Sequence, residues 1–235
     1  MATVSHLLTE LKSLQDKEKQ KAYMRFFKTG KGEYGEGDTF WGITMPKQRM
    51  VAKKYLDLAL PDIQKLLNSD VHECRMTGLL ILTYQFNKAS DGTRKKIADF
   101  YIRNTKRINN WDLVDVTTPR ILGKYLLDKD RKILYTFAQS KNLWERRIAI
   151  ITTQVFISEK QYEDTLNIAE LLLTDKHDLI HKAVGWMLRE VGKYDQETEE
   201  KFLRKHYKKM PRTMLRYAIE KFPEKMRKAY LLGKV

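Results

Sequence analysis

The sequence contains little cysteine, glycine or proline, the residues that cross-link a chain or break its regular structure. Cys74 is the only cysteine among 235 residues, so an intrachain disulfide is excluded and a reducing, cytoplasmic compartment fits. Eleven Gly and five Pro are few for a protein with many turns, which argues against a β-sandwich or barrel. The five histidines are scattered, and H-E-x-x-H and Cys/His ligand patterns are missing. We therefore expect no metal and no cofactor.

Long apolar runs are missing as well. No stretch approaches the ~18 apolar residues of a membrane span. Residues 1–20 are amphipathic and lack the apolar stretch and small residues of a secretion signal, so we expect a helix there. Trp and Phe are scattered instead of forming one apolar face, which argues against a helix lying on a membrane surface. We expect a cytoplasmic protein with no membrane partner.

Acidic residues are outnumbered. The 45 Lys and Arg against 30 Asp and Glu give a formal charge of +15, which points to an anionic partner. The excess is uneven, because residues 201–235 hold twelve basic residues against only Glu220 and Glu224. One end of the chain is therefore strongly electropositive, although a basic tail can also be a solvated helix face.

The arrangement of apolar residues predicts an all-α fold. They recur at helical spacing along nearly the whole chain, as at Leu7, Leu11 and Leu14, without convincing period-two alternation. Hydrophobic residues make up 42% and charged residues 32%, which is the composition of a folding chain.

Similar segments also return at a nearly fixed interval, namely VHECRMTGLLILTYQF, NLWERRIAIITTQVFI, DLIHKAVGWMLREVGK and PRTMLRYAIEKFP. Their alignment places Arg75, Arg147, Lys182 and Arg216 at one equivalent position, or slot. The interval from Arg75 to Arg147 is two periods of 36, and Trp111 stands at the slot between them, so that the steps are 36, 36, 35 and 34 residues. A period of about 35 residues predicts an α-solenoid of HEAT-like helical hairpins. No linker divides the chain, so we predict a single domain over residues 1–235.

Equivalent slots of a solenoid form a row along its concave surface. Four of the five residues in this row are cationic, which suits a basic groove that tracks a phosphodiester backbone. The predicted DNA contacts in the row are Arg75, Arg147, Lys182 and Arg216. The alternative is that these cations pair with acids of neighbouring helices.

The middle of the row differs from the rest. Asp115 stands four residues after Trp111 and therefore shares its helix face, and Trp186 stands four residues after Lys182. An exposed aspartate in a basic groove repels phosphate, so Asp115 needs a function to justify it. Asp112 lies about 100° around the helix from Trp111 and is expected to be a first-turn acid, with Asn109 or Asn110 as the cap.

Three strings in this region are shared with a known family. NWDLVD (110–115), LWERRIA (143–149) and KAVGWMLRE (182–190) resemble the AlkD-like DNA glycosylases, bacterial alkylpurine repair enzymes built from HEAT-like repeats. The likeness covers nearly the full chain, and it implies a bacterial protein that is associated with the nucleoid when bound to DNA. It implies that Asp115 is the catalytic acidic residue, that Trp111 and Trp186 are aromatic walls beside the damaged nucleotide, and that Arg147 contacts the DNA backbone. Arg189 and Tyr23, the latter in KAYMR (21–25), are further expected DNA contacts.

The stretch from Thr29 to Thr39 departs from the family, because it is longer than the usual short connection. Its glycines match G-x-G-x-x-G, but the preceding AYMRFFK is helical instead of a strand. Glu33 and Glu36 would also repel a pyrophosphate. We therefore do not expect a nucleotide-binding loop here.

The chemistry of alkylated purines agrees with a single carboxylate. A purine alkylated to a cationic base is already an activated leaving group, so cleavage of its N-glycosidic bond needs little acid assistance. Asp115 would stabilise the oxocarbenium-like transition state and position or deprotonate water. No lysine is placed as a Schiff-base nucleophile, so the expected product is an intact abasic site.

We predict a monomeric, monofunctional DNA glycosylase that acts on double-stranded DNA containing cationic purines of the 3-methyladenine and 7-methylguanine type. Two alternatives stay open, namely a non-catalytic nucleic-acid-binding solenoid and a scaffold that holds an acidic peptide. The position of Asp115 discriminates between them, because a plain phosphate binder gains nothing from a carboxylate there.

Overall fold

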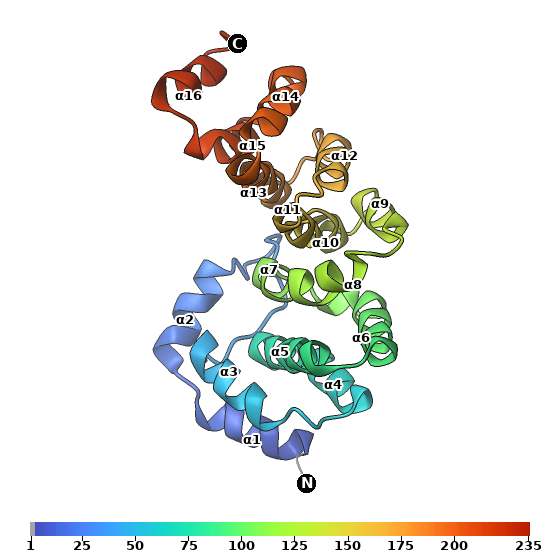
Figure 1. Ribbon diagram of the computed structural model, residues 1–235. Coiled ribbons are helices and arrows are strands. Elements are labelled where there is room, and N and C mark those ends of the chain that lie inside the picture. The colour runs from blue at the N-terminus through green and yellow to red at the C-terminus, as the bar shows by residue number, and fades with distance from the viewer. Residues whose placement is uncertain (1–2) are drawn as a thin grey trace. The chain divides into compact units, whose positions relative to one another are not determined.

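The computed structural model describes residues 3–235, whose regular structure is helical apart from one isolated parallel bridge between Thr39 and Val71 (Figure 1). The all-α prediction is therefore confirmed. Within the described residues, no helix has both the length and the apolar character to cross a bilayer. The contacts divide the chain into two compact units, Met1–Ile121 and Leu122–Val235. The single domain over residues 1–235 stays a prediction.

The first unit is arranged around one central helix. Its elements are α1 (Val4–Ser13), α2 (Lys17–Phe26), α3 (Met45–Lys54), α4 (Leu60–Leu67), α5 (His72–Lys88), α6 (Asp91–Arg103), the 3-10 turn η1 (Thr105–Arg107) and α7 (Trp111–Thr118). The helix expected over residues 1–20 is interrupted from Leu14 to Asp16: residues 4–13 form α1, which buries Leu7 and Leu11, and the chain continues into α2 at Lys17. Residues 1 and 2 lie outside the described residues. Figure 1 shows α5 in the middle of this unit, and α3, α4, α6 and α7 all contact it.

The composition of α5 explains its central place. Thirteen of its seventeen residues are buried, and the consecutive apolar residues from Leu79 to Leu82 face all sides of the helix. Such a helix belongs in a core. Cys74 is among the buried residues and is a free thiol. Gly78 lets α4 approach closely, since a Cβ there would lie 3.1 Å from Leu66.

The second unit is a series of packed helices entered through the π-helical turn η2 (Pro119–Gly123). Its elements are α8 (Lys124–Leu126), α9 (Lys132–Ala138), α10 (Leu143–Thr152), α11 (Gln154–Ser158), α12 (Glu163–Leu171), α13 (Asp178–Tyr194), α14 (Gln196–His206), α15 (Arg212–Ala218), the 3-10 turn η3 (Ile219–Lys221) and α16 (Glu224–Leu231). The long helix α13 contacts α10, α12, α14 and α15. Pro211 and Pro223 precede α15 and α16, where a missing N–H is harmless.

The predicted repeats correspond to successive helices inside each unit. The repeated slot falls on α5 and α7 in the first unit and on α10, α13 and α15 in the second. Within the first unit α5 contacts α7, and within the second α10 contacts α13, which in turn contacts α15. The hairpin repeat read from the sequence is therefore present in both units.

A glycine allows the contact between α13 and α15. A Cβ at Gly185 would lie 2.4 Å from the Met214 carbonyl oxygen and 2.5 Å from Cβ of Tyr217. These distances are too short for any side chain, and the first involves backbone that cannot rotate away. The helices approach this closely only because position 185 has no side chain.

We expect Gly185→Ala to lower the free energy of unfolding by about 1–3 kcal/mol, because the added methyl group overpacks this contact. Urea denaturation followed by circular dichroism measures the change. Gly92→Ala in α6 is the matched control, since nothing lies within 4 Å of its Cβ position, and it should be neutral or stabilising. Equal stability of the wild type and Gly185→Ala would contradict the packing described here.

Candidate functional site

The loop between α2 and α3 is attached to the beginning of α5. The Thr39 amide donates to the Asp70 carbonyl at 3.1 Å, and the His72 amide donates to the Thr39 carbonyl at 2.8 Å. The fully buried Glu73 carboxylate accepts the amides of residues 41, 42 and 43 at 2.8–3.1 Å. Position 42 must be glycine, because φ is +77° and a Cβ would lie 2.2 Å from the Asp16 carbonyl. The loop therefore has a fixed place in the first unit.

The glycine-rich part of this loop satisfies its own amides. The Gly30 amide donates to Glu33 Oε2 at 2.9 Å, and the Gly32 amide donates to Glu36 Oε2 at 2.8 Å. The preceding segment is helix α2, as the sequence predicted. A phosphate would have to displace two carboxylates here, which agrees with the exclusion of a nucleotide-binding loop.

A buried network of charged groups lies between this loop, α5 and α7. Asp38 Oδ1 is 2.6 Å from Nη2 of Arg75, and Asp38 Oδ2 is 3.5 Å from Nδ1 of His72. His72 Nε2 lies 2.9 Å from Asp112 Oδ2, and Asn110 Nδ2 donates to Asp38 at 3.2 Å. Arg75 is only 2% exposed. The predicted DNA contact at Arg75 is therefore wrong, because its guanidinium is used to neutralise a buried carboxylate of the loop.

This network keeps His72 charged. Burial by itself lowers the pKa of His72, but the carboxylates of Asp112 and Asp38 outweigh it and raise that pKa to about 9. Burial likewise raises the pKa of Asp38, and its bonds to His72 and Arg75 bring the pKa below its ordinary value. An imidazolium therefore lies beneath this part of the unit at neutral pH.

Helix α7 begins as the sequence predicted. Asn110 is the N-cap, and its side chain accepts the Trp111 amide at 2.8 Å. Asp112 is a buried first-turn acid whose Oδ1 accepts the Leu113 amide at 2.8 Å. Trp111 and Asp115 lie one turn apart on α7 and are both half-buried. The capped first turn therefore fixes Trp111, while the catalytic role of Asp115 stays a prediction.

An aromatic pocket of about 320 Å³ lies beside Trp111 in the first unit. We define it by Tyr23, Phe26, Phe27, Phe40, Gln48 and Trp111. Trp111 stacks on Phe27 with ring centroids 5.4 Å apart and planes at 21°, and it meets Phe26 at 5.8 Å and 72°. Tyr23 contacts Phe27 and Phe40 edge to face. The structure thus brings together Tyr23 and Trp111, two of the predicted site residues.

The sequence analysis missed the other aromatic residues of this pocket. Phe26 and Phe27 form a doublet directly after KAYMR, and Phe40 follows the glycine-rich loop. The doublet was a usable signal, because two adjacent aromatic residues on a helix cannot share one buried face. Phe40 offered no such signal, since its ring reaches the pocket only through the course of the loop.

The remaining predicted residues belong to the second unit. Arg147 on α10 is 5% exposed, and its Nη1 donates to the Leu179 carbonyl. Lys182 lies 2.7 Å from Asp178, and Arg216 on α15 is exposed. Of these three cations, Arg216 and Lys182, whose side chain is 40% exposed, have the exposure that a surface DNA contact requires, whereas Arg147 is buried. DNA contacts by Arg147 and Lys182 stay predictions.

Trp186 and Arg189 both have acidic partners within the second unit. The half-buried Trp186 donates from its ring nitrogen to Glu190 Oε1 at 2.9 Å. Arg189 forms an ion pair with Glu220. Both residues lie on α13, and their predicted roles beside DNA stay predictions.

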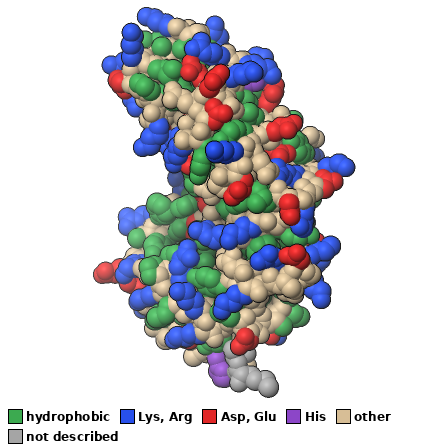
Figure 2. All heavy atoms as spheres, viewed as in Figure 1, with side chains coloured by type: hydrophobic (Ala, Val, Ile, Leu, Met, Phe, Trp, Pro, Cys, Tyr) green, Lys and Arg blue, Asp and Glu red, His purple; other side chains and the backbone are tan. Residues whose placement is uncertain are grey.

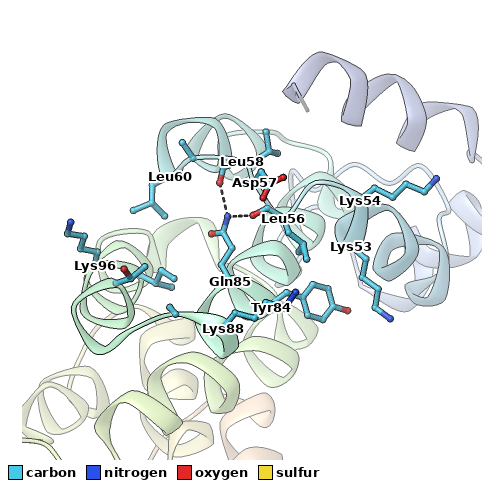
Figure 3. A pocket seen from close by; sticks show the side chains of 14 residues that line it. Lys53, Lys54, Leu56, Asp57, Leu58, Leu60, Tyr84, Gln85, Lys88 and Lys96 are labelled. Atoms are coloured by element: carbon cyan, nitrogen blue, oxygen red, sulfur yellow. Dashed lines mark hydrogen bonds between the residues drawn. The ribbon is translucent and has the colours of Figure 1, made fainter. Parts of the chain in front are cut away.

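A second, larger cavity of about 590 Å³ in the first unit contains none of the predicted site residues (Figure 3). Its lining includes Lys53, Lys54, Lys88 and Lys96, and Gln85 donates to the carbonyls of residues 56 and 58 at 2.8 and 2.7 Å. Among residues 3–235, no group of three or more His, Cys, Asp or Glu side chains is arranged to hold a metal ion.

Cationic side chains are widespread on both units, as the face in Figure 2 shows. Of the twelve basic residues counted in 201–235, all but Arg227 are exposed. The electropositive C-terminal segment is therefore a surface feature of the second unit.

The buried histidine predicts a pH dependence of stability. The pKa of His72 is raised from 6.5 to about 9 on folding. The protonated side chain therefore adds to the free energy of unfolding below pH 6.5, and this stabilisation is lost as the pH rises towards 9. We expect the free energy of unfolding to fall by roughly 3 kcal/mol over this window. Urea denaturation between pH 6 and pH 10 measures it.

Two histidine variants show which group causes this pH dependence, one at His72 and a control at His6. His72→Gln should remove the loss between pH 6.5 and 9, whereas His6→Gln, at an exposed position of α1, should retain it. The same loss of stability in His72→Gln would show that another group titrates and that the network is not its source.

Comparisons with known proteins agree with this architecture. The family model described as DNA alkylation repair enzyme matches residues 7–222. A predicted DNA alkylation repair enzyme from Enterococcus faecalis has a similar structure, with a TM-score of 0.71 and 16% identity over 89% of this chain and 97% of that one. The crystal structure of AlkD2 from Streptococcus mutans is similar as well, with a TM-score of 0.56 and 19% identity over 94% and 97% of the two chains.

A search of curated proteins finds no match to the chain. The two solved structures are too distant in sequence to indicate more than a shared fold. The family model, by contrast, covers most of the chain, including α7 and the beginning of α5 on which the site is built. The chain therefore belongs to the family of DNA alkylation repair enzymes.

Proposed function

We propose that the chain is a monofunctional DNA glycosylase that removes cationic alkylated purines from double-stranded DNA. The observation that carries this proposal is α7, where the half-buried Trp111 and Asp115 lie one turn apart beside an aromatic pocket. Membership in a family of DNA alkylation repair enzymes supplies the kind of substrate. A carboxylate beside an aromatic wall suits a reaction in which positive charge develops on a sugar.

In the proposed reaction, the alkylated base leaves as a neutral molecule and therefore needs no proton from the protein. Positive charge develops on the deoxyribose, where the Asp115 carboxylate stabilises it and positions or deprotonates the attacking water. Trp111 is the proposed aromatic wall in the first unit, whose ring face attracts the cationic nucleotide and excludes water. The matching role of Trp186 stays a prediction. The product is free base and an intact abasic site.

Exposed cations of the second unit are the proposed contacts to the DNA backbone. The exposed candidates are Lys182 on α13 and the basic residues of 201–235 other than Arg227, among them Arg216 on α15. Arg75 is excluded from this set by its burial. Such contacts release counterions from DNA, so affinity should depend strongly on salt.

We expect Asp115→Asn to reduce excision of 7-methylguanine from duplex DNA by at least about 100-fold, because it removes the carboxylate that stabilises the developing cation. DNA binding should be equal or stronger, since a negative charge is lost. Single-turnover excision and a binding titration on the same duplex measure the two effects.

Asp91→Asn is the control for this variant, because Asp91 is an exposed aspartate at the first turn of α6 and should leave excision unchanged. Wild-type excision by Asp115→Asn would refute the mechanism. Strand cleavage by the wild type without alkali, or removal of uracil as fast as 7-methylguanine, would show that a different catalytic group acts.

The salt dependence tests the DNA contacts. The logarithm of affinity for undamaged duplex should fall linearly with the logarithm of salt concentration, and Arg216→Ala should reduce the slope by about one. Lys65→Ala, at an exposed position of α4 outside the predicted row, should leave the slope unchanged. An affinity independent of salt would contradict a phosphate-binding surface.

A further inference from the structure

The lysine-rich cavity of Figure 3 is separate from the candidate site on α7. It lies in the first unit, where the end of α3, the connection to α4, the end of α5 and the beginning of α6 meet. Its α5 residues include Tyr84 and Lys88 in the last turns of that helix, whereas the buried network at His72 and Arg75 occupies the first turn. None of its lining residues belongs to the aromatic pocket or to α7. The proposed reaction therefore does not use this cavity.

The charge of the cavity is strongly positive. Its cations are four lysines, namely Lys53, Lys54, Lys88 and Lys96. Lys54 lies 2.6 Å from Glu10, but the other three are exposed and form no ion pair within the described part of the chain. Asp57 is the only carboxylate in the lining. Three lysines are therefore available to an anionic partner, against one aspartate that would repel it.

These lysines stand at two ends of an apolar space. Figure 3 shows Lys96 on one side of Leu58 and Gln85, and Lys53 with Lys54 on the other. Leu58 and Ile97 in the lining are 3% and 2% exposed, whereas every charged lining residue is exposed. The cavity thus has an apolar centre and a charged rim, as protein-binding sites do. Its ligand must carry apolar groups in the middle and negative charge on both sides.

Gln85 adds a free hydrogen-bond acceptor. Its Nε2 donates to the carbonyls of residues 56 and 58 at 2.8 and 2.7 Å, which occupies both N–H groups and fixes the orientation of the amide. Its Oε1 accepts no hydrogen bond from the described residues. A main-chain N–H of a bound peptide can donate to this oxygen, whereas a phosphodiester backbone offers only acceptors. The cavity therefore suits a peptide better than it suits a DNA backbone.

We propose that this cavity docks an acidic segment of a partner protein, in which leucine-like side chains are flanked on both sides by aspartate or glutamate. The apolar side chains fill the space beside Leu58 and Ile97, and the flanking carboxylates pair with the lysines at the two ends. Charge complementarity selects this occupant. The proposal is independent of the proposed function, because the cavity contains no catalytic residue and none of the proposed DNA contacts.

The probe is a fluorescein-labelled peptide of sequence GDEDLLDEDG, titrated with the full chain at physiological salt and followed by fluorescence anisotropy. We expect it to bind at least about tenfold more tightly than GDEDSSDEDG, because only leucine side chains gain from burial in the apolar centre. The two peptides carry the same charge, so a general attraction to a basic protein cannot separate them. This comparison uses the wild type and does not depend on the folding of a variant.

The double variant Lys88→Glu/Lys96→Glu tests the rim. It should weaken binding of GDEDLLDEDG by at least about tenfold, because two attractive charges become repulsive. Both side chains are exposed and without ion pairs, so the variant should fold. Lys106→Glu in η1 is the matched control, since Lys106 is also exposed in the first unit but lies outside the cavity, and the affinity should stay unchanged.

Three results would overturn the proposal. The first is that GDEDLLDEDG does not bind, or binds no more tightly than GDEDSSDEDG. The second is an equal loss of affinity in Lys106→Glu and in the double variant, which would show attraction to the overall charge of the chain. The third is displacement of the bound peptide by undamaged duplex DNA together with weaker DNA binding by the double variant, which would assign these lysines to DNA.

Discussion

The first unit depends on the buried carboxylate of Asp38. This group comes from the loop after α2 and binds Arg75 on α5, while the side chains of Asn109 and Asn110 donate to it from the residues before α7. His72 extends the network to Asp112 in the first turn of α7. Removal of one partner from such a network leaves a buried charge uncompensated, which is strongly destabilising. The positions of the loop, of α5 and of Trp111 are therefore set together.

Much of the fold could be predicted from the sequence because helix formation depends mainly on residues that are close together in the chain. Periodicity gave the helical class, the repeated strings gave the succession α10, α13 and α15, and the N-W-D sequence gave the cap and first turn of α7. The burial of Arg75 could not be predicted, because its partner Asp38 lies 37 residues away in the glycine-rich loop, and nothing in that loop's sequence marks Asp38 as buried. Repeat position identifies which residues are equivalent, but it does not identify the partner that each one has.

The aromatic pocket could not be predicted either, because the residues that form it are distant in the sequence. Its residues come from α2, the following loop, α3, α5 and α7, and only their packing makes them neighbours. The motif on α7 indicated only Trp111 and Asp115, and the structure adds the aromatic residues that pack beside Trp111. In our account the positive charge of the reacting nucleotide is the property recognised, by Asp115 at the sugar and by the ring face of Trp111 beside it.

The central claim is that this chain breaks the N-glycosidic bond of cationic alkylated purines. The most direct measurement is to incubate the purified full chain with methylated duplex DNA and analyse the soluble fraction for free bases by chromatography. The account predicts release of 7-methylguanine or 3-methyladenine, with normal purines retained and the DNA left sensitive to alkali. A protein that binds this DNA tightly but releases no methylated base would contradict it.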